Sequence, residues 1–304
     1  MRNGRKYFIY DVFTQERLAG NPLAVVIESD GLDTSAMQAI AREFNLSETA
    51  FVLPPKNPTH KAQVRIFTPD YEMPFAGHPT VGTAIALSEL GVGNDLAGIF
   101  VLEENIGLVR CAVTRLGDGL FAEFDLPKLP EQLPLSADAE AIGAALGLGP
   151  HEIGFENHRV SLWSAGVPFV AVPLADLKAA AKVKLNNEAW MEIAPRKNEV
   201  EFANAYVYSR ETVDHTCAFH ARMIVPGSPS YEDPATGSAA AAFAGAIMHF
   251  DKPTDGGQRF WIEQGIEMGR PSKIRLELDV LGAKLVAARI GGHAIRVAEG
   301  VLLA

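Results

Sequence analysis

The chain has little of what marks several large protein classes. It has only two cysteines among its 304 residues, Cys111 and Cys217, and their separation fits neither a disulfide framework nor a metal-binding motif. Acidic residues outnumber basic ones, 37 to 27, and the net charge of -10 argues against nucleic acid or an anionic membrane as a partner. No apolar run reaches the roughly 20 residues that span a bilayer, and the run at residues 7–10 is too short for a signal peptide. We therefore expect a cytoplasmic globular protein.

Several cofactor and catalytic motifs are also missing. No Gly-x-Gly-x-x-Gly sequence follows a predicted strand, which argues against a nucleotide cofactor. The segment Thr236-Gly237-Ser238-Ala239 is not the Gly-x-Ser-x-Gly turn of a serine hydrolase. The histidines outside the site proposed below, such as His249, show no metal-ligand spacing. We expect neither a metal nor a cofactor.

What the chain does contain is an internal repeat. Residues 71–78 (YEMPFAGH) resemble residues 231–238 (YEDPATGS), 160 positions later. Two further pairs occur in the same order, residues 19–26 with 165–172 and residues 65–69 with 222–226, at offsets of 146 and 157. The offset grows to 160 because residues 227–230 lengthen the second loop. A repeat of this length predicts duplicated domains.

The segments between these pairs are rich in predicted strands. Residues 61–68 and 217–225 alternate between apolar and polar side chains, as strands with one buried face do. Two hairpins are predicted, at residues 106–126 with a turn at 117–119 and at residues 273–290 with a turn at 282–283. Amphipathic helices are predicted at residues 34–44 and 137–146, the second with Ser136 as its N-cap.

A proline-rich stretch, residues 126–134, is the predicted linker between two domains. The expected domains are residues 1–128 and 129–304, with the last segment, 291–304, packing back on the first domain. Residues 81–90 and 238–250 predict two helices that are apolar nearly all round, which therefore must be buried on all sides. The expected fold is α+β: two similar domains related by a pseudo-twofold axis, each a strongly curved, mostly antiparallel sheet or barrel around one central helix.

The start of each buried helix is the natural place for a ligand. Unpaired N–H groups and about half a positive charge at a helix N-terminus attract a carboxylate or a developing oxyanion. Gly77 and Gly237 let a ligand approach the backbone closely, so both are candidate substrate-binding residues. The alternative is that these glycines serve only the turn.

Several motifs resemble the signature of the phenazine-biosynthesis PhzF-like isomerases. They are Gly20-Asn21-Pro22, residues 47–52 (SETAFV), residues 76–82 (AGHPTVG), residues 233–239 (DPATGSA), residues 264–272 (QGIEMGRPS) and the closing glycines Gly291, Gly292 and Gly300. The resemblance runs through the whole chain in the family's order. It implies the diaminopimelate-epimerase-like fold, with the active site between two similar domains, and it suggests a homodimer.

The resemblance assigns roles to four side chains. Glu48 matches the glutamate that takes a proton from one substrate carbon and returns it to another, and burial among apolar neighbours would raise its pKa toward neutrality. His78 would donate to the substrate or hand over a proton, Asp233 would hold the substrate, and Ser238 would bind it. Each has a simpler explanation: Glu48 could belong to a turn after the helix at 34–44, His78 and Ser238 could cap helices, and Asp233 before Pro234 is a common turn pair.

The function that the resemblance implies is a cofactor-independent isomerase that moves a proton between carbons of a small carboxylate substrate. The family's named reaction isomerises trans-2,3-dihydro-3-hydroxyanthranilate. Two alternatives stay open, an epimerase or racemase acting on an amino-acid-like substrate and a non-catalytic small-molecule-binding relative. Related racemases carry a cysteine at each helix start, where this chain has His78 and Ser238, so a two-thiol mechanism is disfavoured.

Overall fold

The chain divides into two compact units, each of which is described by itself. The computed structural model describes residues 4–91, 97–196, 202–227 and 229–303, so Ser228 of the predicted loop insertion lies outside the described residues. Unit 1 consists of Met1–Pro127 and Ile290–Ala304, and unit 2 of Lys128–Arg289. The described residues contain no helix that is long and apolar enough to cross a membrane.

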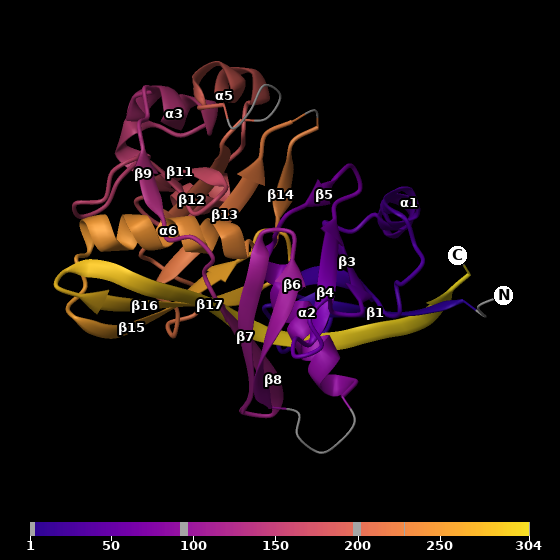
Figure 1. Ribbon diagram of the computed structural model, residues 1–304. Helices are drawn as coiled ribbons and strands as arrows, with labels where there is room; N and C mark the ends of the chain where they lie inside the picture. Colours follow the sequence, from indigo (N-terminus) through magenta and orange to yellow (C-terminus); the bar gives the residue numbers. More distant parts are fainter. Residues whose placement is uncertain (1–3, 92–96, 197–201, 228, 304) are drawn as a thin grey trace. The chain divides into compact units, whose positions relative to one another are not determined.

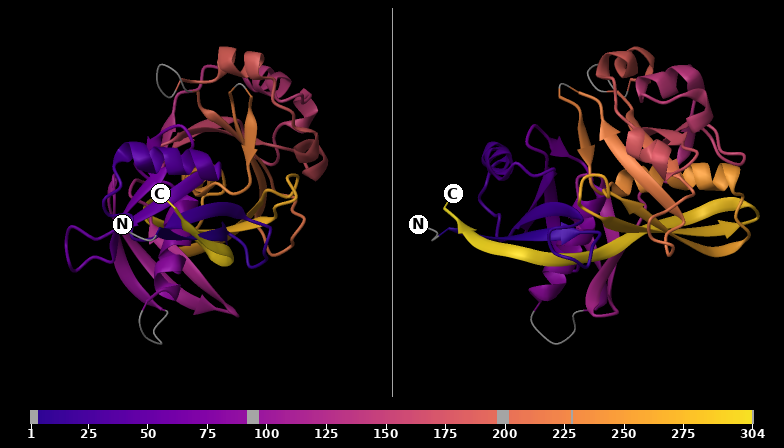
Figure 2. Two further views of the ribbon diagram at one scale, coloured as in Figure 1. Left: turned by 90° about the vertical axis from the view of Figure 1, so that its right-hand side faces the viewer. Right: turned by 180° about the vertical axis from the view of Figure 1, so that it is seen from behind.

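The strands of unit 1 form a closed barrel. Its eight strands, in order around the barrel, are β1 (Arg5–Val12), β2 (Asn21–Val26), β3 (Glu48–Leu53), β4 (Ala62–Phe67), β6 (Gly98–Glu104), β7 (Gly107–Leu116), β8 (Gly119–Asp125) and the part of β17 (Lys284–Leu302) that follows Arg289. The short strand β5 (Glu72–Met73) pairs with β4. The pairs β2–β3 and β4–β6 are parallel. The C-terminal part of β17 runs antiparallel beside β1, which closes the barrel (Figures 1 and 2).

Unit 2 repeats this pairing pattern. Its strands are β9 (Glu131–Leu133), β10 (Ser161–Ser164), β11 (Pro168–Pro173), β12 (Asn204–Ser209), β13 (Phe219–Val225), β14 (Tyr231–Asp233), β15 (Gly256–Gln264) and β16 (Ser272–Leu281). The parallel pairs are β11–β12 and β13–β15, in the places that β2–β3 and β4–β6 occupy in unit 1. The antiparallel pairs β12–β13, β13–β14 and β15–β16 likewise match β3–β4, β4–β5 and β6–β7. An internal duplication would leave this shared pattern.

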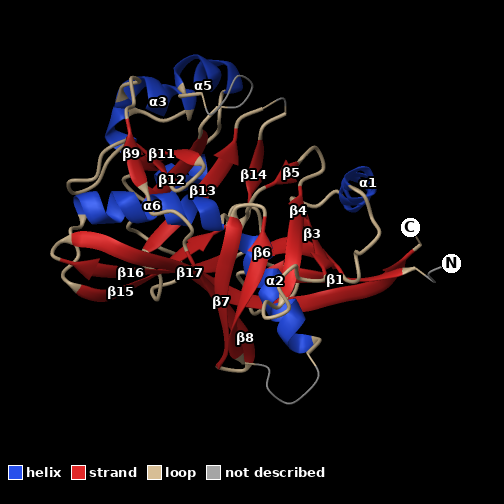
Figure 3. Cartoon of the chain, in the orientation of Figure 1, coloured by secondary structure: helices blue, strands red, loops and turns tan. Residues whose placement is uncertain are grey.

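Each unit contains one helix that is buried on nearly all sides (Figure 3). In unit 1, α2 (Gly77–Glu89) contacts β1, β2, β3, β7 and β8. In unit 2, α6 (Gly237–Phe250) contacts β9, β10, β11 and β16. A Cβ at Gly82 of α2 would lie 2.6 Å from the Leu23 side chain, and one at Gly245 of α6 would overlap the ring of Trp163. These glycines allow the helices and strands to pack closely.

The remaining helices correct several sequence expectations. Helix α1 (Thr34–Phe44) has the predicted bounds. Helix α3 (Ala139–Ala145) is shorter than predicted, and the prediction of Ser136 as its N-cap is wrong: the carboxylate of Asp138 accepts the hydrogen bond from the N–H of Ala141. Both residue types cap well, and the chain uses the one nearer the apolar turn.

Three short elements of unit 2 were not predicted. They are α4 (Leu177–Lys182), α5 (Asn187–Ile193) and the 3-10 helix Pro150–Glu152 (η1). Each has two turns or fewer, which is too short for a helical period to stand out. Helix α5 anchors the core of unit 2 through Trp190, whose ring is fully buried and whose Nε1 donates to the carbonyl of Ala203. The predicted linker also differs, because Glu131–Leu133 within it forms β9 and pairs with β10.

Candidate functional site

Unit 1 brings Glu48 and His78 into contact. Glu48 is the first residue of β3, and His78 is the second residue of α2. The chain reaches Glu48 from α1 through Asn45, whose left-handed conformation (φ 51°) ends that helix. The Nε2 of His78 lies 3.3 Å from Oε2 of Glu48, and the two side chains are only 5% and 15% exposed. Glu48 therefore belongs to a strand whose first side chain lies against the start of the buried helix.

The environment of His78 keeps its imidazole neutral. Burial lowers the pKa of His78 to about 3, because a charged ring would lose its hydration. A neutral imidazole can both donate and accept a proton, so it can share one with the adjacent Glu48 carboxylate. The first turn of α2 has no side-chain cap, since its N-cap residue is Ala76. The N–H groups of Gly77 and His78 are therefore the first two of the helix, and no side chain caps them.

Unit 2 brings Asp233, Gly237 and Ser238 together at the start of α6. Asp233 ends β14 and is buried, and its carboxylate accepts a hydrogen bond from the hydroxyl of Thr236. Thr236 is the N-cap of α6, but its side chain makes no capping bond because the hydroxyl is used on Asp233. Ser238 is half-buried in the first turn and is not the N-cap.

Gln264 completes this second group. Its Nε2 donates to the Asp233 carbonyl at 2.8 Å and to Oγ1 of Thr236 at 3.1 Å. Its Oε1 accepts from the N–H of Thr236 at 3.3 Å. Sequence reasoning assigned no role to Gln264 or Thr236, although both lie in motifs that carry the family resemblance. These contacts hold Asp233 in one position.

The predicted site residues thus fall into two sets. Unit 1 holds Glu48, Gly77 and His78, and unit 2 holds Asp233, Gly237 and Ser238. The two cysteines belong to neither set. Cys111 lies in β7 and Cys217 in the loop before β13, both buried as free thiols, and neither is in the first turn of α2 or α6.

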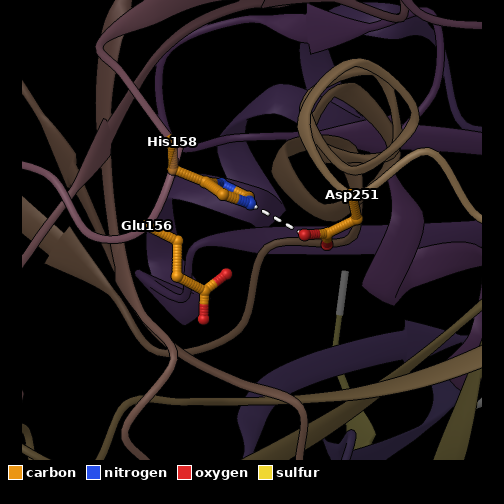
Figure 4. A group of neighbouring side chains, drawn as sticks. All are labelled: Glu156, His158 and Asp251. Carbon is orange, nitrogen blue, oxygen red and sulfur yellow. Dashed lines mark hydrogen bonds and ion pairs between the residues drawn. The ribbon is translucent and has the colours of Figure 1, made fainter.

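One other cluster has the residue types of a metal site. Figure 4 shows Glu156, His158 and Asp251 of unit 2, whose ligand atoms lie within 4.8 Å of one another. The Nη2 of Arg210 binds Oδ1 of Asp251 at 2.6 Å and Oε2 of Glu156 at 3.3 Å. His158 Nε2 also contacts Asp251, at 2.9 Å. A guanidinium already binds both carboxylates, so the cluster fits an ion-pair network better than a cation site.

Residues 10–300 of the chain match the family described as phenazine biosynthesis-like protein. The chain belongs to this family. The same assignment follows from individual relatives. An uncharacterized isomerase of Mesorhizobium japonicum is 74% identical over 298 residues, 98% of each chain. The trans-2,3-dihydro-3-hydroxyanthranilate isomerase of Pseudomonas aeruginosa is 36% identical over 296 residues, 97% of this chain and 98% of the relative.

The fold of the phenazine biosynthesis-like family is also found in solved structures. The crystal structure of the Bacillus anthracis phenazine biosynthesis protein of the PhzF family superposes with a TM-score of 0.89 at 27% identity, covering 99% of this chain and all of that one. Membership of the family makes this chain an isomerase.

Proposed function

We propose that this isomerase works without a cofactor and moves a proton between two carbons of a small carboxylate substrate. Glu48 takes the proton from one carbon and returns it to another. The observation that carries this proposal is the buried contact of 3.3 Å between Glu48 and the neutral imidazole of His78. A carboxylate beside a neutral imidazole in an apolar setting is a suitable base for a carbon acid.

The proposed reaction is a balanced proton transfer. The C–H bond breaks as its proton passes to the Glu48 carboxylate, and the electron pair moves into the conjugated system of the substrate. Neutral His78 donates a hydrogen bond to the oxygen where negative charge develops, beside the N–H of Gly77. The protonated Glu48 then releases its proton to the new carbon, which regenerates the carboxylate.

We further propose a substrate-binding role for the predicted residues of unit 2. Asp233 would bind an amino or hydroxyl group, and the N–H groups of Gly237 and Ser238 would bind a carboxylate. The internal repeat and the strand-pairing pattern that the two units share support this proposal. The homodimer and the cytoplasmic location implied at the start remain predictions.

The 36% identical relative from Pseudomonas aeruginosa supplies the first compound to try, trans-2,3-dihydro-3-hydroxyanthranilate. A wider panel of small carboxylates should be screened for binding by thermal shift. Compounds that bind are then incubated with the protein in deuterated water and followed by NMR. We expect at least one to isomerise, with or without deuterium uptake, because a shielded glutamate can return the same proton. Binding of carboxylates with neither isomerisation nor exchange in any of them would indicate a non-catalytic relative and contradict the proposal.

A further inference from the structure

Glu104 is a buried acid that the proposed reaction does not use. It is the last residue of β6 and is only 7% exposed. Its Oε1 lies 2.9 Å from the hydroxyl of Thr80, in the first turns of α2. Its other oxygen, Oε2, is buried without a hydrogen-bond partner among the described residues. A charged carboxylate in this position would have one hydrogen bond to replace its hydration.

The hydrogen bonds of Thr80 require a proton on Glu104. The Thr80 hydroxyl has one hydrogen but lies within hydrogen-bond distance of two oxygens, the Ala76 carbonyl at 2.8 Å and Glu104 at 2.9 Å. If Glu104 is ionised, both of these oxygens are acceptors, and one short contact has no hydrogen. If Glu104 is protonated, its O–H donates to Thr80 and the Thr80 O–H donates to Ala76. Only the protonated form satisfies both contacts.

The second copy of the repeat provides an independent comparison. In unit 1, Gln63 of β4 lies opposite Glu103 of β6, and in unit 2 His220 of β13 lies opposite Glu263 of β15. Glu103 accepts two hydrogen bonds from backbone N–H groups, at 2.8 and 2.9 Å, and Glu263 accepts two at 2.6 and 2.8 Å. Register and contacts therefore identify Glu103 and Glu263 as equivalent positions.

The residue that follows this glutamate differs between the two copies. Glu104 follows Glu103, and Gln264 follows Glu263. Gln264 contacts Thr236 at the start of α6, as Glu104 contacts Thr80 at the start of α2. The second copy therefore places a neutral amide where the first has a carboxyl group. A protonated carboxyl group has a similar shape and, like the amide, both donates and accepts, although it has one donor hydrogen where the amide has two.

The charges around Glu104 also favour its neutral form. Within the described chain it makes no ion pair, and burial raises its pKa to about 8, against a smaller opposing effect of the Thr80 bond. Burial also raises the pKa of the Cys111 thiol on β7, with further contributions from Glu104 and from Asp125 on β8. On α2, burial holds His78 neutral. No group described here supplies the positive charge that would stabilise an ionised Glu104.

We propose that Glu104 is a neutral carboxylic acid that donates to Thr80 and thereby holds the first turn of α2. Thr80 in turn holds the carbonyl of Ala76, the residue that precedes Gly77 and His78. Glu104 is therefore a positioning residue for the His78–Glu48 pair. Only this last step rests on the proposed function; the protonation of Glu104 does not.

The first test compares the wild type with Glu104→Gln, which copies Gln264. A folded-state pKa above the ordinary 4.5 means that the folded protein binds an extra proton between about pH 4.5 and 8, so wild-type stability falls as pH rises through this window. We expect the Tm of Glu104→Gln to rise relative to wild type from pH 5 to 8 and the difference to level off above pH 8. A difference that does not change with pH contradicts the proposal.

Glu103→Gln is the matched control at the neighbouring position. Hydrogen bonds from the N–H groups of Asn57 and Lys56 hold the pKa of Glu103 down to about 2, so this carboxylate stays ionised over the whole range. Because Nδ1 of His60 lies 2.7 Å from Oε1 of Glu103, the control is measured with His60→Gln present in both proteins, and the loss of stability should then be constant from pH 6 to 9. If the Tm of this control also rose relative to its reference protein up to pH 8 and then levelled off, the assignment to Glu104 would be contradicted.

Infrared spectroscopy observes the proton directly. The difference spectrum of wild type minus Glu104→Gln should contain the C=O stretch of a carboxylic acid at pH 7 and lose it above pH 9. If Glu104→Gln does not fold, Thr80→Val replaces it, and removal of the acceptor should shift the same band to higher frequency. No acid band at pH 7 in the first case, or an unchanged band in the second, overturns the proposal.

The positioning role has a separate readout. The ring of His78 does not titrate near pH 8, so its NMR resonances there report on its surroundings. We expect them to move with a midpoint near pH 8 in wild type and to stay constant in Glu104→Gln. Resonances that do not shift as Glu104 titrates would overturn the positioning role, whether or not the protein turns over any substrate.

Discussion

The segments that lead into α2 and α6 share one set of contacts and differ in the residues that follow. In both copies an arginine binds the glutamate before the helix through two hydrogen bonds, Arg65 with Glu72 and Arg222 with Glu232. After this shared part the copies diverge. The first places a neutral histidine against Glu48, whereas the second holds Asp233 by the hydroxyl of Thr236. The shared contacts hold the loop in both copies, and under the proposed function the differing residues carry the chemistry.

The most severe test of this comparison replaces a residue of the first copy by its counterpart in the second. His78→Ser places at the start of α2 the residue that α6 has at Ser238. Loss of the neutral donor beside Glu48 should lower kcat by about 10²-fold or more, the usual size of a general acid–base contribution. Steady-state kinetics on the substrate found by the screen measures this change. His249→Ser, at an exposed position near the end of α6, is the control and should keep wild-type kcat.

The shared arginines should differ in their effect on stability. Arg222 is buried, and its Nη1 also donates to the carbonyl of Ala180 at 2.6 Å, whereas the Arg65 side chain is 18% exposed. Removing one partner of a buried ion pair costs about 3 kcal/mol or more, and a pair that keeps more contact with solvent, as Arg65–Glu72 does, contributes less. Arg222→Ala should therefore lower the free energy of unfolding by about 3 kcal/mol and Arg65→Ala by about 1 kcal/mol, as measured by urea denaturation. Equal losses would show that the two contacts are energetically alike.

The two copies should also respond oppositely to pH through His220 and His78. Burial alone lowers the pKa of His220, but its hydrogen bonds to Glu263 and Glu267 outweigh this and raise the pKa to about 9. Because this value exceeds the ordinary 6.5, the contribution of His220 is complete below pH 6.5 and is lost as pH rises toward 9. His220→Gln should cost on the order of 2 kcal/mol at pH 6 and progressively less up to pH 9.

His78 has the opposite linkage. Its pKa of about 3 lies below the ordinary 6.5, so wild type should lose stability relative to His78→Gln as pH falls from 6.5 toward 3. Thermal unfolding of the two variants from about pH 3 to pH 9 measures both trends. A cost of His220→Gln that grows with pH, or a His78→Gln difference that is flat in acid, would contradict the assigned protonation states.

The sequence was informative where a pattern is local. The apolar helices and the hairpin turns follow from residues close in the chain, and α6 begins within one residue of its predicted start at Ser238. Contacts that depend on distant pairing could not be predicted. Gln264 reaches Thr236 only because β15 runs parallel to β13. The predicted hairpin ended at residue 290, whereas β17 continues through Gly291 to Leu302. A Cβ at Gly291 would lie 2.6 Å from the side chain of Phe121.

The candidate site shows the same division. Glu48 and His78 were chosen from family motifs, and their contact across β3 and α2 is a property of the fold. Glu104 lies outside every motif that was used, and its signal appears only when the two copies are aligned through the register of their parallel strands.

The central claim is that Glu48 transfers the proton, and one comparison tests it most directly. Glu48→Gln keeps the shape of the side chain but removes the base, and Glu43→Gln makes the same change at an exposed position of α1. Both variants and the wild type are given the same substrate in deuterated water, with binding measured in parallel. We expect Glu48→Gln to bind the substrate but to isomerise it about 10³-fold more slowly or not at all, with Glu43→Gln at the wild-type rate. Turnover by Glu48→Gln at the wild-type rate would contradict the account.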